Sequence, residues 1–83
     1  MAKFIITLKP MSAEQVKTAC LSVMNAAAGT ALKMDWAYVD NATNQPICCW
    51  DGPDRKSVED LFRKAGQPTE SIRAVTVYRA PGA

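Results

Sequence analysis

Cysteines are the first candidates for chemistry in this sequence, because thiolates bind metal ions and act as nucleophiles. The segment "PICCWDGPD", residues 46–54, places Cys48 and Cys49 side by side. Neighbouring side chains of a strand point to opposite faces, so these two thiols cannot easily bind one ion together. Cys20 belongs to a helical pattern, and the chain has no histidine. We therefore predict no metal site within one chain and interpret the cysteines as packing residues.

Aromatic side chains are the second set of candidates. Trp36 and Tyr38 share one face of a predicted strand, and Trp50 shares a face with Cys48 in another. If all four lie on one sheet face, they would line a cleft with a few polar tips, which is typical of small-molecule pockets. Packing between subunits is the other interpretation, since aromatic residues are also enriched at interfaces. The face that carries Cys48 depends on strand register. We take Trp36, Tyr38, Cys48 and Trp50 as the candidate ligand-binding residues.

The carboxylates do not form a pair that suggests a catalytic acid and base. Asp54 is explained as a helix cap, and Glu59 and Asp60 belong to a charged helix face that also carries lysines and arginines. Tyr38 or Asp51 would be the acid or base of an enzyme, and without histidine either would need a strongly shifted pKa. We assign no catalytic residue. A glycine-rich phosphate loop is also absent from the sequence, and no cofactor is predicted.

The first half of the chain predicts a strand, a helix and a second strand. Residues 3–9 alternate as a strand does, and Pro10 ends them. Ser12 and Gln15 form a capping box at the start of a helix that ends at Gly29. The helix has a predicted buried stripe, and residues 31–40 follow as a strand with four large side chains on one face. The stripe comprises Val16, Cys20, Val23 and Ala27, and the strand face comprises Leu32, Met34, Trp36 and Tyr38.

The second half repeats this order. Residues 41–45 form a turn, and residues 46–51 form a third strand that pairs with the second as a hairpin. Asp54 caps a second helix, which Gly66 and Pro68 end. Its apolar stripe comprises Val58, Leu61, Phe62 and Ala65. Residues 71–79 form the last strand.

The predicted fold is therefore α+β, in the order βαββαβ: a ferredoxin-like four-stranded antiparallel sheet with two helices on one face. Two helices cover only one face of such a sheet, yet the strands carry apolar side chains on both, as Phe4 and Ile5 illustrate. Uncovered apolar surface usually marks an interface. We expect a homodimer that buries the open sheet face or lines a cavity there.

Composition narrows the class of protein. The chain has 83 residues, so we predict a single domain over residues 1–83. Ten basic residues against eight acidic ones, without a long basic run, argue against nucleic-acid binding. No apolar run approaches the roughly 18–20 residues that cross a membrane, and the first residues lack a signal-peptide pattern. Three cysteines, an odd number, suit free thiols in a reducing compartment, so a cytoplasmic protein is expected.

Several short motifs resemble a known family. Tyr38-Val39, Cys48, Trp50, Asp51-Gly52-Pro53 and Ala65-Gly66-Gln67-Pro68 match the pattern of small ferredoxin-like domains typified by a bacterial nickel-binding protein, most of them of unknown function. The resemblance covers roughly half the chain. It implies a ferredoxin-like fold, dimerisation and, in at least one member, metal binding. Members commonly carry histidines, and Trp36 and Phe62 stand near two such positions here. The fold is therefore carried over to this chain, and the metal is not.

The sequence favours a small dimeric ferredoxin-like binding or accessory protein that holds a small, partly apolar ligand on its sheet face. One alternative is a dimeric α+β-barrel enzyme, an isomerase, cyclase or cofactor-free oxygenase acting on an aromatic substrate. Another is a metal-binding protein with a thiol site between subunits, formed by Cys48 or Cys49.

Overall fold

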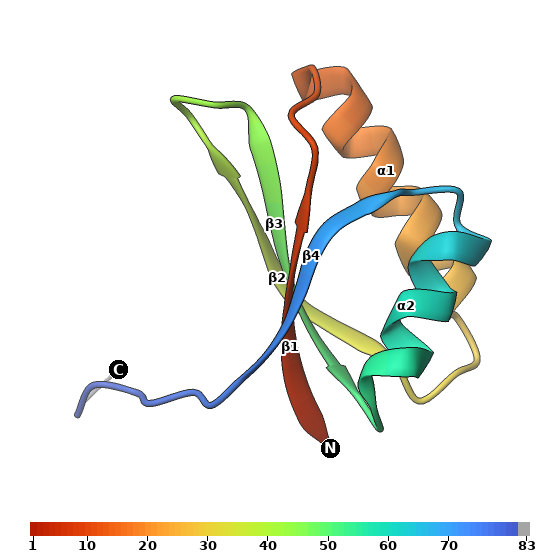
Figure 1. Ribbon diagram of the computed structural model, residues 1–83, viewed down its shortest axis with the longest axis vertical. Helices are drawn as coiled ribbons and strands as arrows, with labels where there is room; N and C mark the ends of the chain where they lie inside the picture. Colours follow the sequence, from red (N-terminus) through yellow and green to blue (C-terminus); the bar gives the residue numbers. More distant parts are fainter. Residues whose placement is uncertain (82–83) are drawn as a thin grey trace.

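The computed structural model describes residues 1–81 and contains four strands and two helices (Figure 1). In chain order these are β1 (Ala2–Leu8), α1 (Ala13–Ala27), β2 (Lys33–Asp40), β3 (Gln45–Gly52), α2 (Arg55–Lys64) and β4 (Thr69–Val75). The predicted order βαββαβ is confirmed. Among the described residues, no helix is long and apolar enough to cross a membrane.

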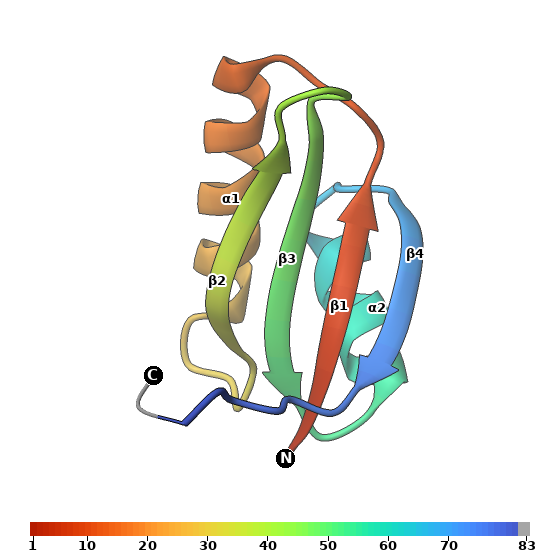
Figure 2. The ribbon, with the colours of Figure 1, turned by 90° about the vertical axis from the view of Figure 1, so that its left-hand side faces the viewer.

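The strands form one antiparallel sheet in the order β2-β3-β1-β4. Both helices lie on the same side of this sheet (Figure 1), so the other side, which we call the open face, has no helix over it. Figure 2 shows the four strands side by side, with the helices behind them. This is the predicted ferredoxin-like fold.

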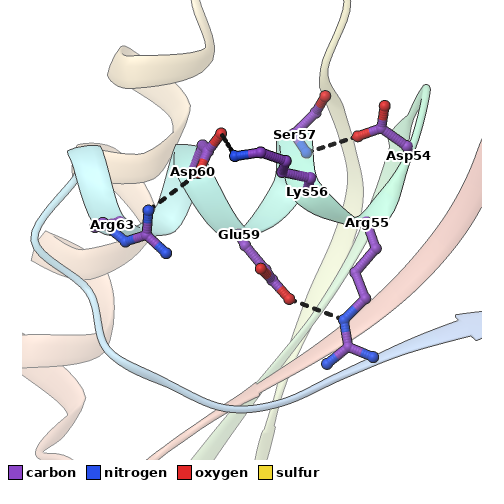
Figure 3. A network of polar contacts seen from close by, with 7 residues as sticks. All are labelled: Asp54, Arg55, Lys56, Ser57, Glu59, Asp60 and Arg63. Atoms are coloured by element: carbon purple, nitrogen blue, oxygen red, sulfur yellow. Dashed lines mark hydrogen bonds and ion pairs between the residues drawn. The ribbon is translucent and has the colours of Figure 1, made fainter.

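Both helices begin at the predicted caps. The Ser12 hydroxyl accepts a hydrogen bond from the Gln15 backbone N–H at 3.2 Å, and the Gln15 side chain accepts one from the Ser12 backbone N–H at 2.9 Å. Asp54 accepts a hydrogen bond from the Ser57 backbone N–H at 2.7 Å (Figure 3). The charged face of α2 is covered by ion pairs within the helix, Arg55–Glu59, Lys56–Asp60 and Arg63–Asp60. These side chains therefore stabilise α2 through contacts within the helix.

The core lies between the helices and the sheet. Trp50 is 1% exposed, and its ring meets Phe62 of α2 edge-on, with ring centroids 5.9 Å apart. The buried stripe of α2 is as predicted at Val58, Leu61 and Phe62. That of α1 differs, because Ala19 is buried where Val16 and Cys20 are only half-buried. Cys20 therefore lies at the edge of the buried stripe.

The prediction that Leu32, Met34, Trp36 and Tyr38 share one face is wrong. A β-bulge interrupts the pairing of β2 with β3 between Met34 and Trp36. Met34 lies opposite the buried Trp50, and both Leu32 and Met34 pack against the core. After the bulge, Trp36 lies opposite Cys49 on the open face. One additional residue in a strand shifts every later side chain to the other face.

The last strand is shorter than predicted, because β4 ends at Val75 and not at residue 79. Beyond it, the chain leaves the sheet on the side opposite the helices (Figure 1) and runs across the sheet toward β2 (Figure 2). Val77 is 41% exposed and Tyr78 is 90% exposed on this segment. We call residues 76–81 the C-terminal segment.

Candidate functional site

Strand register arranges the open face as rows of neighbouring side chains. One row runs from Trp36 on β2 through Cys49 on β3 and Ile5 on β1 to Arg73 on β4. The next row toward the hairpin comprises Tyr38, Ile47, Thr7 and Ser71. A third row of the same face, on the side of the Trp36 row away from the hairpin, comprises Lys33, Asp51, Lys3 and Val75. The face thus has an apolar centre, an aromatic edge on β2 and charged residues at one end.

The bulge in β2 brings Asp35 and Trp36 onto the same face. Successive residues of a regular strand alternate, whereas a bulge re-aims a side chain and recurs beside functional sites. The Asp35 carboxylate forms an ion pair with Lys3, which lies on the open face, and Trp36 lies opposite Cys49 on that face. An acidic and an aromatic side chain are therefore consecutive on the open surface.

Trp36 and Tyr38 form a pair of exposed aromatic rings. Their centroids are 6.5 Å apart and their planes are tilted by 57°. Trp36 is 43% exposed and Tyr38 is 58% exposed. The guanidinium of Arg79, from the C-terminal segment, lies 5.9 Å from the centroid of the Trp36 ring. That distance is within the range of a cation–π interaction.

Lys3 lies between two carboxylates at the charged end of the face. Its ammonium pairs with Asp35 and, at 2.9 Å, with Asp51. Asp35, and then Asp51, raise the pKa of Lys3 because their carboxylates accept hydrogen bonds from its charged form. Lys3 is therefore protonated near neutral pH and cannot act as a base there. The three charges sum to −1.

The four candidate ligand residues do not share one face. Trp36 and Tyr38 lie on the open face, whereas Cys48 (4% exposed) and Trp50 (1% exposed) lie in the core beneath the helices. The expectation of one cleft lined by all four is thus corrected for Cys48 and Trp50. The physical reason is the bulge, because without it Trp36 would follow Met34 onto the core side with Trp50.

The cysteines occupy three different settings. Cys48 lies in the core, and burial, reinforced by the neighbouring Cys20, raises the pKa of its thiol to about 12. Cys49 faces the other way and is 5% exposed, and burial also raises its pKa. Metal ligation and nucleophilic attack both need the thiolate. Among residues 1–81, no group of three or more cysteine and carboxylate residues is positioned to hold a metal ion. Because Cys48 lies in the core, it cannot contribute to a metal site between two open faces, which leaves Cys49 as the candidate thiol for that alternative.

Thiol labelling tests this placement. We expect a maleimide reagent at neutral pH to modify Cys20 first, because Cys20 is half-buried and the other two are buried. A pKa of about 12 in place of 9.0 lowers the thiolate fraction of Cys48 by about a thousandfold, so its labelling is expected to be at least about a hundredfold slower than in urea. Peptide mapping by mass spectrometry follows each site. Labelling of Cys48 as fast as Cys20 in the folded protein would contradict this arrangement.

A groove on the helix side is a second candidate for the site. It has a volume of about 480 Å³ and lies between α2 and β4, with Phe62 and Ile72 among its apolar lining residues. Arg55 and Glu59 at its rim are paired with each other, and Arg63 pairs with Asp60. Glu70, also in the lining, accepts a hydrogen bond from the Gln45 side chain at 2.9 Å. The groove residues include no pair of stacked or tilted aromatic rings, so we place the candidate site on the open face.

Sequence reasoning missed three residues of the site, namely Lys3, Asp35 and Arg79. The Lys3–Asp35 pair joins residues 32 positions apart, and only the sheet register reveals it. Arg79 was assigned to a strand that in fact ends at Val75. A signal was present at Asp35, since an aspartate inside an apolar strand is unfavourable unless a bulge or partner accommodates it.

Comparison with known proteins agrees with the fold. No protein-family model and no curated protein sequence matches the chain. The crystal structure of SCO4226 from Streptomyces coelicolor A3(2) matches 94% of this chain and 100% of that one, with a TM-score of 0.80 and 18% sequence identity. The similarity is one of fold. The resemblance to nickel-binding-like domains stays a prediction.

Proposed function

We propose that this protein is a cytoplasmic homodimeric binding protein that holds a small, partly apolar ligand between the open faces of two copies. The observation that carries the proposal is the exposed Trp36–Tyr38 pair at the edge of an apolar sheet face that no helix covers. The cytoplasmic part of the proposal rests on the three free thiols, which suit a reducing compartment.

A second copy is the occupant that the face favours. A two-fold axis parallel to the strands would lay β2 of one copy over β4 of the other, because it reverses the strand order across the interface. Asp35, beside the row of Trp36, would then approach Arg73 on β4 of the other copy. The same rotation lays β3 over β1, so Ile5 would lie over Cys49 of the other copy and Ile47 over Thr7. The same rotation would give the exposed Val77 and Tyr78 a neighbouring surface.

The aromatic pair favours a ligand beside this interface. Two rings inclined by 57° form adjoining walls, which a flat dimer contact does not require. Lys3, Asp35 and Asp51 supply fixed polar groups at the neighbouring end of the face. Apolar walls with a few placed polar groups are the usual composition of a small-molecule site.

Native mass spectrometry of protein purified without added ligand tests the proposal. We expect a dimer that carries an additional mass, lost when Trp36 and Tyr38 are both replaced by alanine. Leu21→Ala is the matched control, because Leu21 is 55% exposed on α1, away from the open face. A bare monomer at micromolar concentration would contradict the proposal.

A further inference from the structure

We propose that the Trp36–Tyr38 pair is a binding site for an organic cation, and that Arg79 occupies this site in the free chain. The inference rests on the proposed function, since it names the class of ligand for the same face. Its basis is a cation that is already present: the Arg79 guanidinium lies 5.9 Å from the Trp36 centroid. The protein's own side chain thus shows which charge these rings accept.

The rings have the geometry that a cation requires. The face of an aromatic ring is negative because of its quadrupole, and it attracts ammonium and guanidinium groups within about 6 Å of the centroid. Trp36, the stronger of the two ring types, leaves 43% of its surface exposed although it lies beside Cys49. Tyr38 adds a second wall at 6.5 Å. Two or more aromatic walls are the usual means of recognising quaternary ammonium groups.

The carboxylate next to Trp36 in the chain also favours a cationic ligand. Asp35 precedes Trp36 in the bulge, and it shares Lys3 with Asp51, so this cluster retains one negative charge. Lys33 and Arg73 also belong to this face, so the five charged side chains together carry a charge of +1. The charged residue nearest to Trp36 in the chain is nevertheless Asp35, and its carboxylate favours a cation over an anion at the rings.

Arg79 belongs to a segment whose described residues are all exposed. The C-terminal segment leaves the sheet after Val75, and Tyr78 on it is 90% exposed. A guanidinium on such a segment can leave the ring at small cost, so a free cation competes with it directly. Removal of Arg79 is therefore expected to tighten binding of an external cation.

Three probes of one shape separate charge from hydrophobicity: choline, the neutral 3,3-dimethylbutan-1-ol and the anionic 3,3-dimethylbutyrate. Each is titrated into ¹⁵N-labelled protein while the two indole N–H resonances are followed. We expect choline to shift the Trp36 signal and to bind more tightly than both isosteres. Trp50 is the internal control, since it is 1% exposed and its signal should not move.

Variants test the roles of the named residues. A cation–π contact at an exposed site corresponds to about a two- to fivefold change in affinity. Tyr38→Leu is expected to weaken choline binding by that factor, and the indole N–H signal of Trp36 can still be used to measure the affinity. Arg79→Ala is expected to tighten binding by a similar factor. Arg63→Ala removes the same charge from α2 and is expected to change nothing.

The inference and the proposed function fail in different ways. Choline binding no tighter than that of either isostere, or an Arg79→Ala variant with unchanged affinity, would overturn the cation site even if native mass spectrometry shows a liganded dimer. A monomer without additional mass in native mass spectrometry would overturn the proposed function, whichever of the three probes binds most tightly. The inference would be supported if choline binds most tightly of the three probes, the indole signal of Trp36 shifts and that of Trp50 does not move.

Discussion

Replacing Trp50 with alanine is expected to lower the free energy of unfolding by about 3–5 kcal/mol, the usual cost of removing a large buried aromatic side chain. Trp50 is 1% exposed, packs edge-on against Phe62 and lies opposite both Phe4 and Met34. An 83-residue domain has a total stability of about 4–12 kcal/mol, so this loss is a large part of the whole. Urea denaturation followed by circular dichroism measures it.

Two further variants make this result specific. Trp36→Ala is expected to cost no more than about 1 kcal/mol, because Trp36 is 43% exposed. Trp50→Phe is expected to cost less than Trp50→Ala, because it fills most of the space and removes an indole N–H that has no hydrogen-bond partner among the described residues. It also keeps the protein measurable if the alanine variant does not fold. The protein concentration is kept below the dissociation constant of the dimer, because dimerisation contributes to stability and would add the interface contact of Trp36 to its cost. Equal costs at Trp36 and Trp50 would contradict the assignment of one to the face and the other to the core.

The second large effect is expected at the centre of the open face, where Ile47→Lys should weaken dimerisation by at least about a hundredfold. Ile47 lies between Tyr38 on β2 and Thr7 on β1. In a two-fold dimer the change places two ammonium groups in the interface, and each would lose its hydration without gaining a partner. Sedimentation equilibrium measures the dissociation constant directly.

Leu21→Lys is the matched control for this experiment. It introduces the same charge at a large exposed apolar residue, 55% exposed, on α1 on the helix side. We expect the dimer to be unchanged. Loss of the dimer in Leu21→Lys with retention in Ile47→Lys would show that the helix side is the interface and would contradict the open-face account.

Most of the fold could be predicted because its signals are local. Ser12 with Gln15, and Asp54 with Ser57, start the helices through contacts within three residues. The spacing of Val58, Leu61 and Phe62 identifies the buried side of α2. Such patterns need no knowledge of distant partners, and the ferredoxin-like order follows from the elements they define.

The candidate site could be predicted only in part, because it depends on register. The alternation of Trp36 and Tyr38 correctly places them together, and that of Cys48 and Trp50 does the same. Whether Trp36 and Tyr38 share a face with Cys48 and Trp50 was decided by a single additional residue in the bulge after Met34. The partners of Lys3 and the place of Arg79 depend on contacts between distant segments, which no local pattern contains.

The most direct test of the open face measures how solvent reaches the two tryptophans. A soluble gadolinium chelate broadens the signals of exposed N–H groups in a ¹H–¹⁵N spectrum. In the wild-type dimer we expect the indole N–H of Trp36 to be protected, and in Ile47→Lys we expect it to be broadened, while Trp50 is protected in both. A wild-type Trp36 signal as strongly broadened as that of the Ile47→Lys variant would contradict the account, because the open face would then be free of both partner and ligand.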